Sequence, residues 1–137
     1  TAPTVAEKFE EVKSAADKMS NEEAVAYYLK KHPELKGIFA LNETSTQLGI
    51  QVLDELDNSD EIQIVGFDAG KEQVKALEDG ELDGLVVQNP FGMGYAAVIA
   101  SARTVLEIGN EAEVNTGYVW VTAENMDDAD IKPLVYK

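Results

Sequence analysis

The sequence predicts an α/β protein in which a parallel sheet lies between helices on both of its faces, a three-layer arrangement. Two apolar, β-branched segments carry this prediction. Ile64–Phe67 stops abruptly at Asp68, and Val86–Val87 stops in the same way at Gln88. Strands that lack a polar alternation are typical of sheets buried on both faces. Helix-like segments separate these strands, which favours parallel strands joined by helical crossovers.

The amino-terminal part contains two helix starts. Thr4–Glu7 has the pattern of a capping box, and a helix is expected from there to about Lys18. A strand over Glu11–Ala16 is the alternative interpretation of the same stretch. Ser20 begins a second capping pattern, and the helix that follows is expected to stop before Pro33.

The middle of the chain alternates three short apolar strands with two helices. Strands are expected over 37–41, 62–67 and 82–87, and helices over 45–56 and 71–79. The second of these helices ends at Gly80, a residue type that commonly closes helices. Pro90 then opens a long helix that closes at Gly109 and Asn110, and an extended segment is expected over 114–122.

Composition excludes several classes of function. The 137 residues suit one compact domain, and the formal net charge of −15 repels the phosphates of nucleic acids. There is no cysteine, so disulfides, zinc–thiolate sites and cysteine catalysis are excluded. The chain has one histidine and no Gly-x-Ser-x-Gly motif, which indicates a binding protein rather than an enzyme. No cofactor or metal site is predicted.

Three polar residues follow the three apolar strands: Asn42, Asp68 and Gln88. Right-handed crossovers place the carboxyl ends of such strands at one edge of the sheet, where α/β sheets bind ligands. A carboxylate accepts hydrogen bonds from hydroxyl groups, and amides both donate and accept, as a sugar requires. The alternative is local: Asn42 and Gln88 form turns or cap helices, and Asp68 caps the helix that begins near Lys71.

Four segments, taken in order, carry a resemblance to a known family: 35–43, 64–69, 87–95 and 121–128. From about Ser20 to the end, the chain resembles the carboxyl-terminal half of ABC-transporter sugar-binding proteins of the ribose-binding-like, type I periplasmic group. The resemblance implies a flavodoxin-like lobe in which Asn42, Asp68 and Gln88 contact the sugar. Glu43 stands where many relatives have aspartate.

The resemblance also implies that the lobe is incomplete. A whole family member has two lobes and about twice this length, and the aromatic residues that sandwich the sugar come from the amino-terminal lobe. Residues 1–137 are therefore expected to be a single carboxyl-terminal lobe or a fragment, with 91–115 belonging with the missing lobe. The apolar stripe of the 91–109 helix then needs a companion lobe, a second copy or its own sheet, and self-association is favoured over repacking.

The function expected from these observations is monosaccharide binding for an ABC importer. It implies a sugar ligand, a membrane permease as partner, and a location outside the cytoplasm, in the periplasm or as a cell-surface lipoprotein. The main alternative is the effector domain of a lactose-repressor-type transcription regulator, which shares the fold. The acidic composition and the segment 121–128 favour the transporter protein. A flavodoxin-like hydrolase or kinase is a third class.

Overall fold

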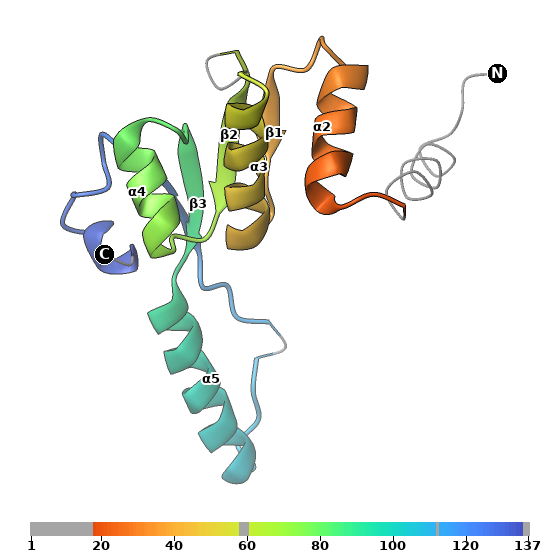
Figure 1. Cartoon of the computed structure of the whole chain (residues 1–137). Helices are drawn as coiled ribbons and strands as arrows, with labels where there is room; N and C mark the ends of the chain where they lie inside the picture. The colour runs from red at the N-terminus through yellow and green to blue at the C-terminus, as the bar shows by residue number, and fades with distance from the viewer. Residues whose placement is uncertain (1–17, 58–60, 112, 136–137) are drawn as a thin grey trace.

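The computed structural model describes residues 18–57, 61–111 and 113–135, which form one four-stranded sheet with helices (Figure 1). In chain order the elements are α2 (Asn21–Lys31), β1 (Gly37–Phe39), α3 (Glu43–Glu55), β2 (Gln63–Phe67), α4 (Lys71–Asp79), β3 (Gly84–Gln88), α5 (Pro90–Val105), β4 (Tyr118–Val121) and the 3₁₀ helix η1 (Lys132–Leu134). The α/β class is confirmed. The helix expected from Thr4, and the alternative strand at Glu11–Ala16, lie outside the described residues.

The helix ends follow the predicted capping chemistry. At the start of α2, the Ser20 hydroxyl accepts a hydrogen bond from the Glu23 amide at 3.1 Å, and the Glu23 carboxylate accepts one from the Ser20 amide at 2.9 Å. The helix α4 ends at Gly80, whose φ of 81° lies in the left-handed region. A residue without a Cβ adopts that conformation at little cost.

The strands occur in the order β1-β2-β3-β4, and the first three are parallel. This confirms that the three apolar strands are neighbours. The sheet is mixed rather than wholly parallel, because β4 runs antiparallel to β3. The chain leaves the carboxyl end of β3 through α5 and returns to that same end, where Tyr118 pairs with Gln88. A strand that starts there has to run in the opposite direction.

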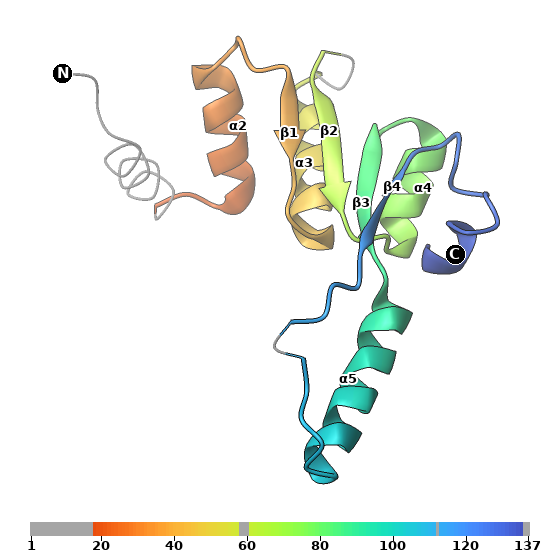
Figure 2. The same ribbon diagram turned by 180° about the vertical axis from the view of Figure 1, so that it is seen from behind.

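The helices α3 and α4 cover one face of the sheet, which buries Ile64, Leu85 and Val121. The sequence predicted helices on both faces, but in the described residues the opposite face carries half-exposed aromatic side chains, with Phe39 55% and Trp120 47% exposed (Figure 2). The physical reason is topological. The chain steps from β1 to β2 to β3 in one direction, and successive right-handed crossovers then place both connecting helices on the same face.

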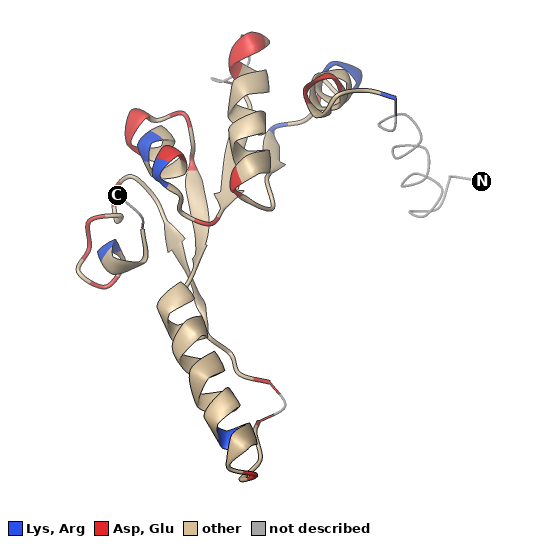
Figure 3. Cartoon of the chain, turned by 60° about the horizontal axis from the view of Figure 1, so that its bottom comes forward, with Lys and Arg blue, Asp and Glu red and all other residues tan. Residues whose placement is uncertain are grey.

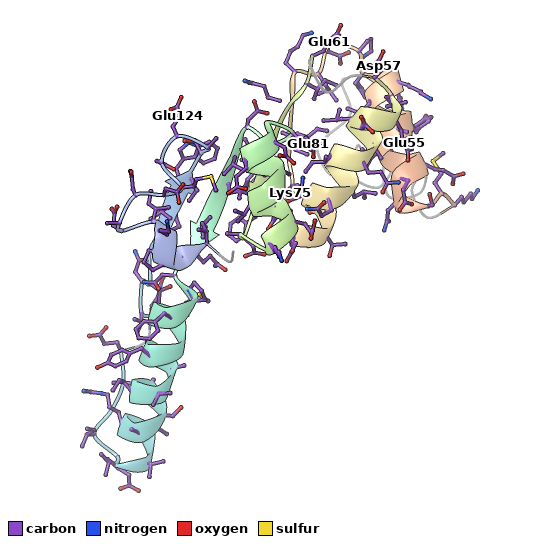
Figure 4. All side chains as sticks on the ribbon, turned by 60° about the vertical axis from the view of Figure 1, so that its left-hand side comes forward. Glu55, Asp57, Glu61, Lys75, Glu81 and Glu124 are labelled. Carbon is purple, nitrogen blue, oxygen red and sulfur yellow. The ribbon has the colours of Figure 1, made fainter. Side chains whose placement is uncertain are left out.

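The helix α5 projects away from the sheet and buries none of its residues (Figures 1 and 2). It carries a single charged residue, Arg103, whereas acidic residues are frequent around α3 and α4 (Figure 3). Its side chains stand clear of the sheet (Figure 4), so α5 does not pack back onto it. Helical geometry stops at Val105, earlier than expected, and Asn110 Nδ2 donates a hydrogen bond back to the Ala100 carbonyl at 3.0 Å. Among the described helices, none has the length and apolarity needed to cross a membrane.

Candidate functional site

The candidate site lies at the carboxyl edge of the parallel strands. Asp68 directly follows β2, Gln88 is the last residue of β3, and Asn42 comes three residues after the end of β1. Because these strands are parallel neighbours, their polar ends meet at one edge, as the sequence indicated. The roles of these three residues as ligand contacts stay predictions.

A cavity of about 250 Å³ opens at this edge between the two strand ends and the first turns of α3 and α5. Its lining consists of Glu43, Asp68, Ala69, Gly70, Val87, Gln88, Pro90 and Leu134. Two of the residues predicted from the sequence, Asp68 and Gln88, therefore share one cavity. Asn42 does not line it, and its neighbour Glu43 does.

Asn42 is the N-cap of α3. Its Oδ1 accepts a hydrogen bond from the Ser45 amide at 2.8 Å, and its own amide donates to the Ser45 hydroxyl at 3.1 Å. The capping alternative considered for this residue is therefore present in the structure. Capping uses the oxygen of the side-chain amide, so the Nδ2 group is left to donate to a ligand.

Asp68 has an unusual backbone conformation, with φ at 76°. Its amide donates to the Val86 carbonyl at 3.0 Å, which joins the end of β2 to β3. The N-cap of α4 is Gly70, so the alternative that Asp68 caps this helix is wrong. A non-glycine residue in the left-handed region is strained, and such residues cluster at binding sites.

Gln88 is half-buried at the end of β3, and it does not cap α5 either. That role belongs to Asn89, whose Oδ1 accepts a hydrogen bond from the Gly92 amide at 2.8 Å. The helix-capping alternative for Gln88 is therefore wrong. Its amide is left to donate and accept within the cavity that it lines.

Glu43 is the residue of this cavity whose role the sequence left open. It begins α3, and its carboxylate lies so close to Gly70 that a Cβ built on that glycine would clash with Oε1. A glycine at position 70 is therefore what allows the Glu43 side chain to occupy this place. Glu43 and Asp68 make the cavity wall acidic, which favours ligands that donate hydrogen bonds.

Other reactive residues lie elsewhere. His32 is the C-cap of α2, just before the amino end of β1, with Nδ1 3.0 Å from the Glu34 carboxylate. The cavity is at the carboxyl ends of the strands, on the opposite edge of the sheet. In the part of the chain that the structure describes, no group of three or more His, Asp or Glu side chains is arranged to hold a metal ion.

Three parallel strands with hydrogen-bonding side chains at their carboxyl ends define the class: an α/β ligand-binding lobe. A family model described as a periplasmic binding protein domain matches residues 4–109, and the chain belongs to this family. The family consists of binding proteins rather than enzymes.

Known relatives agree with this assignment. The xylose/arabinose-binding protein of Sulfolobus acidocaldarius is 27% identical over 110 residues, which cover 75% of this chain. An ABC transporter solute-binding protein from Agrobacterium vitis with bound D-fucose superposes with a TM-score of 0.75 at 26% identity over 84% of this chain. A carbohydrate transporter solute-binding protein from Agrobacterium radiobacter, in complex with D-arabinose, superposes with a TM-score of 0.72 at 33% identity over 80%.

The chain corresponds to only part of each relative. It spans 27% of the Sulfolobus protein and 40% and 37% of the two solved structures.

Proposed function

We propose that the chain is the sugar-contacting lobe of an extracytoplasmic solute-binding protein that serves an ABC importer. The observation that carries this proposal is that Asp68 and Gln88 line the same cavity at the carboxyl edge of the sheet. Neither side chain caps a helix, so local structure does not account for the polar groups there. The D-fucose and D-arabinose bound to two similar proteins support a monosaccharide as the ligand.

The cavity chemistry suits an uncharged polyhydroxyl ligand. The Asp68 carboxylate accepts hydrogen bonds from two hydroxyls, and the Gln88 amide donates to one oxygen and accepts from another hydroxyl. Asn42 Nδ2 supplies a further donor beside the cavity. Two carboxylates in one wall, Glu43 and Asp68, repel phosphate and carboxylate groups. Neutral sugars are therefore favoured over sugar phosphates.

A titration with two monosaccharides tests this proposal. In the ¹⁵N-labelled chain, D-arabinose and D-fucose are expected to shift the amide signals of residues 43, 68–70 and 88, whereas a sugar phosphate is not. Shifts that are absent, or scattered over the whole surface, would contradict sugar binding at this edge.

Two variants then assign the contacts. Asp68→Asn keeps the side-chain shape and tolerates the left-handed backbone, and Gln88→Ala removes the amide. Each is expected to weaken sugar binding by ~1–3 kcal/mol, the cost of leaving a buried polar partner unpaired. Asp79→Asn is the matched control, because Asp79 is exposed on α4. If all three variants bind the sugar as tightly as the wild-type protein, Asp68 and Gln88 have only a structural role in turns.

We further infer that residues 91–115 belong with a second lobe. Phe91 at the start of α5 is 81% exposed and Val98 in its middle is 68% exposed. A soluble protein rarely leaves such a continuous apolar face in water. In the complete protein the companion surface would close the cavity from the other side, and the closed form would meet the membrane permease. Without a companion, we expect the isolated chain to self-associate through α5.

Sedimentation velocity over a range of concentrations tests the self-association. The weight-average sedimentation coefficient is expected to rise with concentration, and Val98→Lys is expected to suppress that rise. Leu35→Lys, a similar change at an exposed leucine before β1, is the control. A monomer at every concentration would refute self-association through α5.

A further inference from the structure

Two polar side chains are fully buried in the described part of the chain, and they meet each other. Thr46 on α3 and Gln73 on α4 are both 0% exposed. Gln73 Nε2 donates to Thr46 Oγ1 at 3.1 Å, across the contact between the two helices. Neither residue lines the cavity. Gln73 is the third residue of α4, and its bond to the Gly70 amide is the capping-box bond of that helix, whereas its bonds to Thr46 and Phe67 reach beyond the helix start.

Their hydrogen bonds reach both loops of the candidate site. Gln73 Nε2 also donates to the Phe67 carbonyl at 2.8 Å, and Gln73 Oε1 accepts from the Gly70 amide at 2.9 Å. These two bonds lie on either side of Asp68. On the other side of the network, Thr46 Oγ1 donates to the Asn42 carbonyl at 2.8 Å. One buried network therefore connects the backbone at Asn42 with the backbone that flanks Asp68.

We propose that Gln73 is a positioning residue, which acts through Thr46 to hold the Asn42 and Asp68 loops at a set spacing for a rigid polyhydroxyl ligand. This inference rests on the proposed function. A sugar ring presents its hydroxyls at nearly constant separations, so two loops that recognise one ring have to keep their own separation. Binding groups held by side chains behind them keep the geometry that a ligand needs.

The network also explains how Asp68 is kept in a strained conformation. A residue with positive φ persists when its surroundings over-determine it, and here the bonds to Phe67 and Gly70 clamp both ends of the turn. Both N–H donors of the Gln73 amide are used, and so are its oxygen and the Thr46 hydroxyl hydrogen. A fully satisfied buried network is rigid, because breaking any one bond leaves a polar group unpaired in the interior.

Close packing leaves the network little freedom to shift. A Cβ built on Gly66 would lie 2.7 Å from Thr46 Cγ2 and 2.8 Å from Thr46 Oγ1, so the threonine rests directly on the β2 backbone. The position of Thr46 is thereby set by the sheet, and the position of Gln73 is set by Thr46. Movement of one loop is transmitted to the other through these contacts.

The test compares isosteric variants of the full chain. Thr46→Val keeps the shape of the side chain and removes its hydroxyl, whereas Thr46→Ser keeps the hydroxyl. Gln73→Met removes the amide at similar volume, and it provides a second route if Thr46→Val does not fold. Gln51→Met is the matched control, since Gln51 is an exposed glutamine on α3 whose Nε2 donates to Glu55 at 2.9 Å.

The first readout needs no ligand. In ¹⁵N spectra, Thr46→Val is expected to shift the Asp68 and Gly70 amide signals as strongly as those near Asn42, and to speed hydrogen exchange of the Gly70 amide. Thr46→Ser is expected to return both properties towards wild type, and Gln51→Met to leave them unchanged. Shifts confined to α3 would overturn the proposed coupling.

The second readout is the affinity for D-arabinose. Thr46→Val and Gln73→Met are expected to weaken binding about tenfold, which corresponds to ~1.4 kcal/mol. Thr46→Ser and Gln51→Met should stay within twofold of wild type. If the network only stabilises the fold, thermal stability falls and affinity does not, which refutes the positioning role. If wild-type protein binds no monosaccharide, the proposed function fails, and the first readout alone decides whether the two loops are coupled.

Discussion

Replacement of Gly66 by alanine tests the packing that underlies the site. Gly66 lies on β2 beneath α3, and an added Cβ would meet Thr46 Cγ2 at 2.7 Å, Thr46 Oγ1 at 2.8 Å and Leu85 Cδ2 at 2.9 Å. Thr46 is fully buried and hydrogen-bonded, and Leu85 is 0% exposed, so neither side chain has free space to enter. Overpacking of this kind costs about 1–3 kcal/mol, and three close contacts place Gly66→Ala near the upper end.

The effect is measurable as a shift in the unfolding temperature. For 137 residues the unfolding entropy is about 0.3 kcal/mol/K, so a loss of ~2–3 kcal/mol lowers Tm by about 7–10 °C. Circular dichroism at 222 nm follows the transition. Gly94→Ala is the matched control, because a Cβ at that position on α5 meets nothing within 4 Å and alanine favours a helix by about 0.5–1 kcal/mol. A Gly66→Ala protein as stable as wild type would refute the packing argument.

Three further predictions concern stability and protonation. Gly80→Ala is expected to lower the free energy of unfolding in urea by about 1 kcal/mol, because φ of 81° strains any residue with a Cβ. Leu85→Ala should cost roughly 2–5 kcal/mol in the same assay, whereas Val105→Ala, at an 81% exposed position, should stay within about 0.5 kcal/mol of wild type. The pKa of the Glu34 carboxyl is lowered, first by a hydrogen bond to its own backbone amide and then by His32. An NMR titration should therefore find this pKa below the ordinary glutamate value, and His32→Ala should raise the pKa in part. Since the folded-state pKa is depressed, the stabilisation by Glu34 is present above its unfolded-state pKa and is lost as the pH falls through the folded-state value.

The elements that the sequence predicted well are those set by local chemistry. The helix α4 has the predicted bounds, because a buried stripe and Gly80 define it within a few residues. The direction of β4 was not predictable in this way, since it depends on where α5 and the return segment lead the chain. Within the described residues, α3 and α4 lie on the same face because of the spatial order of three strands, which no local pattern reveals.

The candidate site was predictable to a similar extent. Strand ends at one sheet edge were enough to bring Asp68 and Gln88 into one cavity, but not to decide that Glu43 rather than Asn42 lines it. Gln73 was missed because glutamine normally belongs to the solvated face of a helix. The spacing along the helix could have indicated its burial, because Gln73 lies four residues before Leu77, on the buried face of α4. Its burial depends on Thr46, which is 27 residues away in the sequence.

The conformation of Asp68 connects these observations. An aspartate in the left-handed region is less stable than a glycine there by on the order of 1 kcal/mol, and Asp68 gains no helix-capping bond, because the N-cap position of α4 is Gly70. The strain is balanced by the Gln73 bonds on both sides of the turn, and the Gln73 side chain that makes them is fully buried. A simpler turn with glycine at position 68 would need no such clamp, but it would carry no carboxylate. Asp68 and Gln88 line the same cavity, and the ligand contact proposed for the Asp68 carboxylate would account for an aspartate at this position.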